Sequence, residues 1–408
     1  MVIRLAWRNI WRNRRRTIIT LFSIGMGLTF SLFFIALGEG VYDQMIDQIV
    51  RMQAGHITLQ HPKYRDAPSV DQWIEIPQEL RREIERWPEV ESTKMLVLGQ
   101  GIAKTGSGNV AAAIMGVEPG VERQSSPLAK NLVEGAYLQE KDKSLVVLGL
   151  EMAERLHLGL GKKLVISTND VNGMLVDQLC RVKGIYRTGS DEMDAYVIQV
   201  PITFARRLFN MPEKGATEMG VILKNPGFQE AVLKKIQART RDLGVSVLTW
   251  QEVLPQVASY IRMDKGSNWV LQGILIFLIL FTIFNTMLMS VLERKREFAM
   301  LLALGTAPGK LRLQVFMESV LLGFIGSCGG MLMGSLAVYL GHRYGINMSA
   351  IMGDSVNISG FAVSTKMHTK FSYGIILGTT AVVFGATVLL SLLPMRHATK
   401  LSIVENIK

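Results

Sequence analysis

Residues 269–292 read WVLQGILIFLILFTIFNTMLMSVL, an apolar run without one acidic or basic side chain. A helix needs about 20 apolar residues to cross the hydrocarbon core of a membrane. Three further stretches have the same character, and the only acidic or basic side chain in any of them is that of Glu318. They are residues 17–38, 315–340 and 371–395. The sequence therefore predicts an α-helical membrane protein with four transmembrane helices.

The composition agrees with this fold class and points to one large insertion. Of the 408 residues, 49% are hydrophobic and 19% are charged, whereas a soluble domain carries about 25% charge. Between the first two apolar runs lie residues 39–268, in which 28 Lys and Arg balance 29 Asp and Glu. Such a near-neutral stretch is long enough to bury a core of its own. We expect an α+β domain there, since short strand-like and helix-like patterns alternate with Gly and Pro turn signals.

The excess positive charge predicts the orientation in the membrane. The net charge is +11, and residues 1–16, 293–314 and 396–408 together carry all of it. With four spans these segments lie on one side, which the positive-inside rule makes the cytoplasm. The 39–268 domain and the 341–370 loop then lie outside. Nucleic-acid binding is excluded, because no basic patch remains to support it.

The chain start combines an amphipathic pattern with the first apolar run. Ile3, Trp7, Ile10 and Trp11 recur at helical spacing beside arginines, which predicts a helix lying in the cytoplasmic membrane interface. The alternative is a charged flank without a fixed helix. The apolar run that follows is longer than the 7–15-residue apolar region within a signal peptide, so we expect it to be retained as an anchor. If it were cleaved, three spans would remain and the C-terminus would still be cytoplasmic.

Two helical extensions should connect the external domain to the membrane. Apolar residues recur beyond the first span with helical spacing, so we expect that helix to continue several turns and to end at Gly55. A second extension, over residues 255–268, leads into the second span. The apolar residues either face a substrate cavity or a second chain, or cover the domain's own core, and the pattern favours neither. They are Val41, Met45, Ile49 and Met52.

Small residues four apart allow helix backbones to approach closely. The third span has three such glycines and the fourth has two, and we interpret all five as helix-packing positions. They are Gly326, Gly330 and Gly334, and Gly374 and Gly378.

No pattern for catalysis, metal binding or nucleotide binding is present in this sequence. The string nearest to a P-loop begins at Gly305 and has three residues between its glycines, where the motif needs four, and no hydroxyl after Lys310. We therefore expect neither an enzyme active site nor a bound cofactor or metal in this chain.

The loop after the second span, ERKREFAMLLALG over residues 293–305, is the most informative segment. Charged residues precede a short amphipathic helix that should end at Gly305. Such a helix has the shape needed to dock into a partner's groove. Arg294, Arg296 and Glu297 are expected to orient it by charge pairs with a partner or with lipid phosphates, while Phe298, Leu301 and Leu302 fill the groove. The alternative is a charged flank that only sets topology.

This loop, followed by Glu318, strongly resembles the signature of FtsX-like ABC-transporter permeases. The start AWRNIWRNRRRT, the end LLPMRHATKLSIVENI and the internal VVLGLEMAERLHLGLGKKLVI resemble that family's N-terminus, C-terminus and extracytoplasmic core domain. The resemblance covers nearly the whole chain. It implies a permease of the bacterial inner membrane with a periplasmic domain, a second permease chain as homodimer or heterodimer, and two ATPase subunits that hold ATP and Mg. The loop residues that would couple to the ATPase are Arg294, Arg296, Glu297, Phe298, Leu301, Leu302 and Gly305.

Within that family, VKGIYRTGSDEMDAYVIQV with Asp194 and VSVLTWQEV with Trp250 resemble the lipoprotein-releasing LolC/LolE-like permeases. Those proteins extract acylated lipoproteins and pass them to a periplasmic carrier. The exit of the first span, ALGEGVYDQM, departs from that subgroup, because it lacks an M-N-G-F-like string. The resemblance implies transport of a lipid-anchored or amphipathic substrate. The alternatives are a MacB-like exporter of peptides or small molecules working with an adaptor, and FtsX-like signalling that activates a cell-wall hydrolase.

Overall fold

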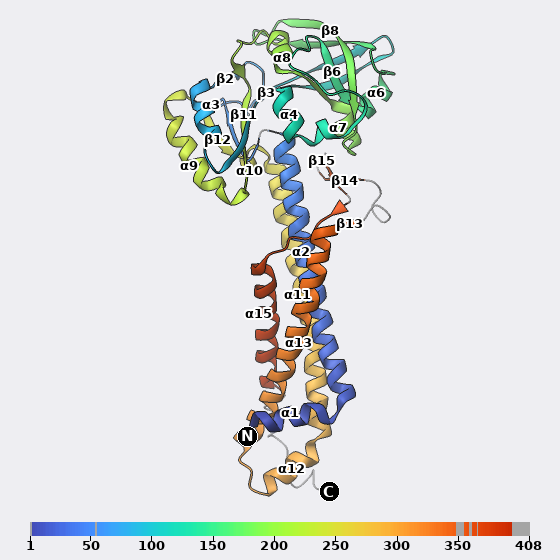
Figure 1. The fold of residues 1–408 in the computed structure, drawn as a ribbon, viewed down its shortest axis with the longest axis vertical. Helices are drawn as coiled ribbons and strands as arrows, with labels where there is room; N and C mark the ends of the chain where they lie inside the picture. Colours follow the sequence, from blue (N-terminus) through green and yellow to red (C-terminus); the bar gives the residue numbers. More distant parts are fainter. Residues whose placement is uncertain (1, 54, 348–354, 359–360, 365, 394–408) are drawn as a thin grey trace. The chain divides into compact units, whose positions relative to one another are not determined.

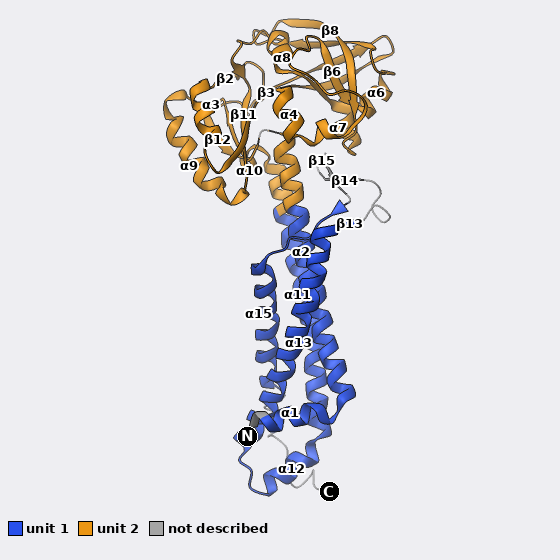
Figure 2. Ribbon diagram, viewed as in Figure 1, with its two compact units in different colours: residues 1–42, 262–347, 366–408 blue, residues 43–261, 348–365 orange. Residues whose placement is uncertain are grey.

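The computed structural model describes residues 2–53, 55–347, 355–358, 361–364 and 366–393, and the chain divides into two compact units (Figures 1 and 2). Unit 1 contains residues 1–42, 262–347 and 366–408, and unit 2 contains residues 43–261 and 348–365. The predicted cytoplasmic tail, 396–408, lies outside the described residues.

Unit 1 is helical. Four helices of the described chain are long and apolar enough to cross a membrane, and each overlaps one predicted span. Two of them are 39 residues long, or about 58 Å at 1.5 Å per residue, well beyond the ~30 Å of a hydrocarbon core. The predicted extensions of the first two spans are thus present as continuous helix. The four are α2 (Arg14–Met52), α11 (Pro255–Glu293), α13 (Pro308–Tyr344) and α15 (Tyr373–Leu390).

Unit 1 also contains two shorter helices. The predicted N-terminal helix is α1 (Val2–Arg12), which packs on α13 with Ala6 and Ile10 buried and the Trp7 and Trp11 rings 6.0 Å apart. The amphipathic loop helix is α12 (Lys295–Ala303). It ends as predicted, because Gly305 has a φ of +87°, a left-handed conformation that terminates helices.

Glycines bring α13 against α2. A Cβ added at Gly326 would lie 2.8 Å from the Cβ of Ile24, and one at Gly330 would lie 2.7 Å from the carbonyl oxygen of Gly25. Gly334 faces Leu32 in the same way, so the prediction of helix packing is confirmed for these three. At Gly378 no described atom lies within 4 Å of an added Cβ, and at Gly374 the nearest is a serine side-chain atom at 3.6 Å, so for these two the packing prediction remains a prediction. These two lie on a side of α15 that no described helix approaches closely.

Unit 2 is built on a ten-stranded mixed sheet in the order β12-β1-β11-β3-β4-β9-β6-β8-β5, with β7 pairing β3 and β8. Its strands are β1 (Ile57–Gln60), β3 (Val90–Thr105), β4 (Gly108–Val117), β5 (Leu132–Gly135), β6 (Leu145–Gly149), β7 (Lys163–Asn169), β8 (Leu175–Tyr186), β9 (Val197–Pro201), β11 (Glu218–Leu223) and β12 (Ser246–Thr249). Its main helices are α3 (Gln78–Glu85), α4 (Pro119–Ser125), α5 (Pro127–Lys130), α6 (Leu150–Arg155), α7 (Asp191–Tyr196), α8 (Ile202–Leu208), α9 (Gln229–Arg239) and α10 (Trp250–Val253). Two further strand pairs of unit 2 lie outside this sheet: β2 (Ile74–Glu75) with β10 (Gly215–Ala216), and β14 (Ser355–Ile358) with β15 (Phe361–Ser364). A fourth set of paired strands, β13 (Ile346–Asn347) with β16 (Lys366–Met367), belongs to unit 1. The expectation of an α+β domain is met.

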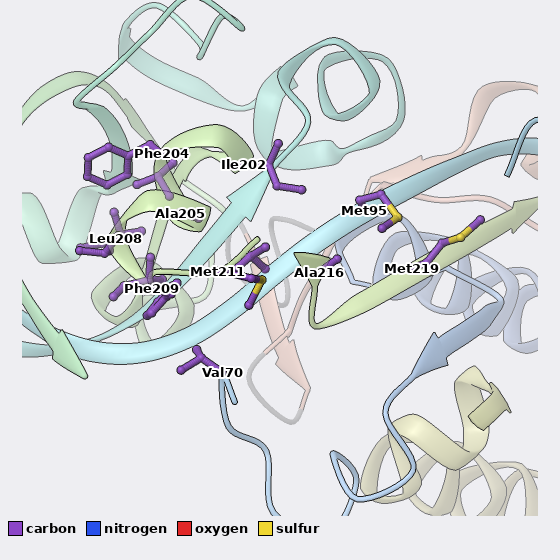
Figure 3. Packing of buried hydrophobic residues seen from close by; sticks show 14 of the residues in the cluster. Val70, Met95, Ile202, Phe204, Ala205, Leu208, Phe209, Met211, Ala216 and Met219 are labelled. Atoms are coloured by element: carbon purple, nitrogen blue, oxygen red, sulfur yellow. The ribbon is translucent and has the colours of Figure 1, made fainter. Parts of the chain in front are cut away.

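The core of unit 2 forms where α8 lies on β3 and β4 (Figure 3). The helix can come this close because two strand positions are glycine. A Cβ at Gly99 would lie 2.3 Å from the ring of Phe209, and one at Gly116 would lie 2.3 Å from the Cβ of Ala205. The buried apolar residues around this contact belong to one large cluster, which makes unit 2 a domain with its own hydrophobic core.

Candidate functional site

A partly buried ion-pair network lies at the α12 end of unit 1. Glu318, on α13, is the acidic residue of the third apolar run, and its two carboxylate oxygens accept hydrogen bonds from Arg294 Nη1 at 3.1 and 3.0 Å. Asn9 Nδ2, from α1, donates a third at 2.7 Å. The side chains of Arg294 and Glu318 are only 10% and 12% exposed. An acidic side chain in an apolar helix needs such partners to offset its desolvation.

Further ion pairs extend this network to α12. Glu297 accepts from Arg12 at 2.6 Å and from Arg294 Nε at 3.0 Å. Partial burial would raise the pKa of Glu297, but these hydrogen bonds hold it below its ordinary value. Arg16 and Glu293 pair at 2.7 Å between α2 and the end of α11. We name Asn9, Arg12, Arg294, Glu297 and Glu318 the Glu318 network; it joins α1, α12 and α13.

The inner side of α12 is packed against its own chain. Phe298 is 1% exposed and lies in a cluster with Val291, Leu311 and Val315, with Leu302 packed against it. The Arg294 guanidinium lies 5.0 Å from the centre of the Phe298 ring, at cation–π distance. This packing revises the expectation that Phe298 fills a partner's groove, because its surface is already covered, whereas Leu302 remains partly exposed.

The opposite side of α12 is uncovered by the described residues. Met300 is 54% exposed, Leu301 36% and Leu304 83%, and Arg296 is exposed as well. Arg296, Met300 and Leu304 are spaced four apart and so share one face of the helix. We name Arg296, Met300, Leu301 and Leu304 the α12 outer face. It joins exposed apolar surface to one positive charge.

The predicted coupling residues thus separate into two groups. Leu301 and Arg296 lie on the outer face, and Gly305 ends the helix. Arg294 and Glu297 were expected to pair with a partner or with lipid, but they pair within the chain. Sequence reasoning missed Asn9 and Met300. The lone acidic residue Glu318 was a signal that some polar partner must exist, although the pattern could not identify it.

A second feature of unit 1 is a groove of about 350 Å³ between α2 and α11. Its apolar lining is Phe34, Ile35, Trp269, Leu271, Ile274 and Leu275. One end is polar: Lys265 pairs with Glu39 at 3.0 Å and lies 4.9 Å from the centre of the Tyr42 ring. The Tyr42 hydroxyl donates to Asp264 at 2.5 Å. The groove therefore combines an apolar wall with a charged end.

The four apolar residues of the α2 extension are mostly buried within the chain. Met45, Ile49 and Met52 are each at most 2% exposed, and Val41 is partly buried. Met52 packs in a unit 2 cluster with Leu96, Leu128 and other residues. This placement favours the interpretation that these residues cover the protein's own core.

Asp194 and Trp250 both have structural roles in unit 2. Asp194 is 2% exposed and accepts from the backbone N–H and the hydroxyl of Thr188 at 2.9 and 2.7 Å. The backbone N–H of Trp250 donates to the carbonyl oxygen of His56 at 3.0 Å. Among the described residues no group of three or more His, Cys, Asp or Glu side chains is placed to hold a metal ion.

Two family models match the sequence. The MacB-like periplasmic core domain matches residues 17–239, and the FtsX-like permease C-terminal domain matches residues 269–403. An ABC transporter permease of Methanocaldococcus jannaschii is 23% identical over 100% of this chain and 97% of its own length. The lipoprotein-releasing system transmembrane protein LolC of Neisseria meningitidis is 21% identical over 64% of each chain. The macrolide export ATP-binding/permease protein MacB of Nitrosomonas europaea is 24% identical over 98% of this chain, which spans 58% of that relative.

Proposed function

Since the chain belongs to the FtsX-like permeases with a MacB-like periplasmic core domain, and is an ABC transporter permease of the MacB/LolC type, we propose that it couples ATP hydrolysis on a separate chain to the extraction or export of a lipid-anchored or amphipathic substrate. The α12 outer face is the observation that carries the coupling half of this proposal. This sequence has no P-loop of its own, so the energy must enter through a protein contact.

The geometry of α12 supports a role as the contact element. Its inner side is fixed by Phe298 packing and by the Glu318 network, while Leu301 and Leu304 remain uncovered by described residues. A force on the outer face would therefore reach α13 through Glu318 and α1 through Arg12, since both bond to residues of this segment. A rigid helix that presents apolar anchors is a common mode of groove recognition.

The groove between α2 and α11 supports the substrate half. Its apolar wall suits an alkyl chain, and its charged end, with Lys265 and Glu39, suits a polar head group. An amphipathic molecule has both parts. We therefore assign the groove as the place where a lipid-anchored substrate first contacts this chain.

The remaining partners follow from the same proposal. Four helices enclose little space, so a second permease chain, identical or related, would complete the pathway, and each chain would bind one ATPase subunit that holds ATP and Mg. The termini would be cytoplasmic and unit 2 would lie outside the bacterial inner membrane, where a lipoprotein carrier or an adaptor would meet it. A MacB-like exporter would move soluble peptides or small molecules instead, and an FtsX-like signalling protein would move none.

The coupling contact is tested by substituting Leu301 with Asp in the full permease. Truncating an anchor residue of an interface, or replacing it with a charged one, typically costs about 2 kcal/mol or more of binding free energy, which is about 30-fold in affinity. We expect Leu301→Asp to lose co-purification of the ATPase chain found with the wild type and to lose substrate-stimulated ATP hydrolysis. Glu297→Gln weakens an exposed ion pair within the chain and should change binding by less than about fivefold.

Leu243→Asp is the matched control, because Leu243 of unit 2 is 37% exposed, as Leu301 is 36% exposed. It should leave both measurements at wild-type values. Unchanged ATPase binding and turnover in Leu301→Asp would remove α12 from the mechanism.

A further inference from the structure

Unit 2 contains a cavity of about 1130 Å³, slightly larger than the range of about 300–1,000 Å³ usual for small-molecule sites. Met52 and Gln53, at the end of α2, form one side of it. Strands β3 and β4 contribute Leu98 and Met115, and α7 contributes Met193. All of its lining residues belong to unit 2.

The body of the cavity is apolar and rich in thioethers. Met52, Met115 and Met193 line it together with Leu98 and Leu128. Met52 and Leu128 belong to a buried cluster of unit 2, against which Leu98, Met115 and Met193 pack while remaining partly exposed. Methionine side chains adapt to ligands of different shape, because they are unbranched and polarisable. Such a lining suits a flexible apolar ligand.

The acidic groups of the cavity lie on one short helix, α7. Asp191 and Glu192, in the first turn of α7, are exposed and line the cavity, and neither forms an ion pair among the described residues. Tyr196, four residues after Glu192 and so on the same face, is 39% exposed and also lines it. The one cation of the lining, Arg155, is already paired with Glu151 at 2.8 Å.

We propose that this cavity binds a cationic amphiphile, with the apolar body among the methionines and the positive head beside Asp191, Glu192 and Tyr196. Two carboxylates without a cation attract positive charge. An exposed aromatic face adds a cation–π contact, which is especially suited to alkylated ammonium groups. The site is independent of the coupling proposed above, since unit 2 forms it alone and no ATP is needed to fill it.

A different explanation of the two acidic residues is that they only stabilise the start of α7 through the helix dipole. The two explanations predict different ligand selectivity. If the acids only stabilise the helix, their neutralisation affects charged and uncharged ligands alike. If they contact the ligand head group, only the cation loses affinity.

The test uses the full chain in lipid nanodiscs without ATPase or ATP. The probes are photoreactive decyltrimethylammonium and a photoreactive decyl maltoside, with labelled peptides mapped by mass spectrometry and non-photoreactive decyltrimethylammonium as competitor. We expect saturable cation labelling at peptides that contain Met52, Met115 and Met193. Asp191→Asn combined with Glu192→Gln should weaken cation binding about fivefold and leave the maltoside within about twofold.

Met115→Trp fills the cavity and should lower labelling by both probes at least tenfold, or about 1.4 kcal/mol. If hydrogen exchange shows that this variant unfolds unit 2, Met193→Trp at the rim takes its place.

Glu140→Gln combined with Asp242→Asn neutralises two exposed carboxylates outside the cavity and should leave the labelling by both probes unchanged. Leu301→Asp should bind the cation as the wild type does, which separates this site from ATPase coupling. Two outcomes would overturn the proposal. One is an equal effect of the combined Asp191→Asn and Glu192→Gln change on both probes, and the other is unchanged labelling in the variant whose cavity is filled by tryptophan.

Discussion

The buried ammonium of Lys94, on β3, donates a hydrogen bond of 2.7 Å to the carbonyl oxygen of Arg51, in the last turn of α2. A cation at this place also interacts favourably with the helix dipole. The carboxylate of Glu122 lies 3.6 Å from the same ammonium, and both side chains are 1% exposed. The Arg51 side chain binds both oxygens of Glu91 at 2.9 Å. The end of α2 is thus held to β3 by its main chain and its side chain, so the last turn of this helix and the sheet should move together.

Replacing Lys94 with Met tests this connection. The variant leaves Glu122 buried without its cation, and breaking such a buried pair costs about 3–5 kcal/mol. We expect native-state hydrogen exchange in β3 to accelerate accordingly. Glu122→Gln in the Lys94→Met background should recover part of the loss, because it removes the unpaired charge. A double variant that is as unstable as the sum of the two single variants would show that the two side chains are not coupled.

Glu218, on β11, predicts an unusual pH dependence for unit 2. Burial raises the pKa of this carboxyl from 4.5 to about 7, although the charge of Lys94 opposes the shift. Between these two values the folded state binds a proton that the unfolded state releases, so unit 2 loses stability as the pH rises from 4.5 to 7. Glu218→Gln removes this loss. It should stabilise unit 2 by about 3 kcal/mol at pH 8 and by almost nothing at pH 4.

The measurement is the urea unfolding midpoint of unit 2 in the full protein at both pH values. Glu134→Gln is a suitable control, because Glu134 is exposed on β5. The same gain at pH 4 and pH 8 for Glu218→Gln would contradict the assignment of a titrating buried carboxyl.

Arg294 is predicted to hold α12 in place. Arg294→Met leaves Glu318 without its cation and also breaks the bond to Glu297, so we expect the amides of α12 to lose about 2–4 kcal/mol of protection. Arg294→Lys should recover little, since a lysine cannot reproduce the planar guanidinium that serves both carboxylates. Hydrogen exchange over residues 295–303 measures the effect.

Arg16→Gln is the matched control for that experiment. It breaks the more exposed pair with Glu293, whose carboxylate is 50% exposed, and should cost at most about 1 kcal/mol. Protection of α12 that is equal in the Arg294→Met and Arg16→Gln variants would show that the Glu318 network does not fix this helix.

The parts of the structure that could be predicted are those that depend on local pattern. Apolar length predicted α2, α11, α13 and α15, and amphipathic spacing predicted α1 and α12. The same spacing could not show that Phe298 faces its own bundle, because an apolar stripe marks a covered side without naming what covers it. The partners of Lys94 could not be predicted either, since Arg51 and Glu122 are far from it in sequence and meet it only in the fold.

The glycines of α13 and α15 provide the last prediction, because both helices have glycines four residues apart but only those of α13 lie against another helix. A Cβ at Gly330 would lie 2.7 Å from the carbonyl oxygen of Gly25. This oxygen belongs to the backbone, so it cannot move aside unless the helix itself shifts. Gly330→Ala must therefore push α13 away from α2, also straining the hydrogen bond of Thr29 to the Gly330 carbonyl at 3.3 Å. We expect a loss of about 1–3 kcal/mol in the stability of the helical unit.

Gly378→Ala makes the same chemical change where no described atom lies within 4 Å. Alanine favours helix over glycine by about 0.5–1 kcal/mol, so this variant should be neutral or slightly more stable. Titration of the purified protein with sodium dodecyl sulfate, followed by tryptophan fluorescence, compares the two midpoints. Equal midpoints for the Gly330→Ala and Gly378→Ala variants would mean that the approach of α13 to α2 does not limit stability, and that the glycine spacing in the third span has another cause.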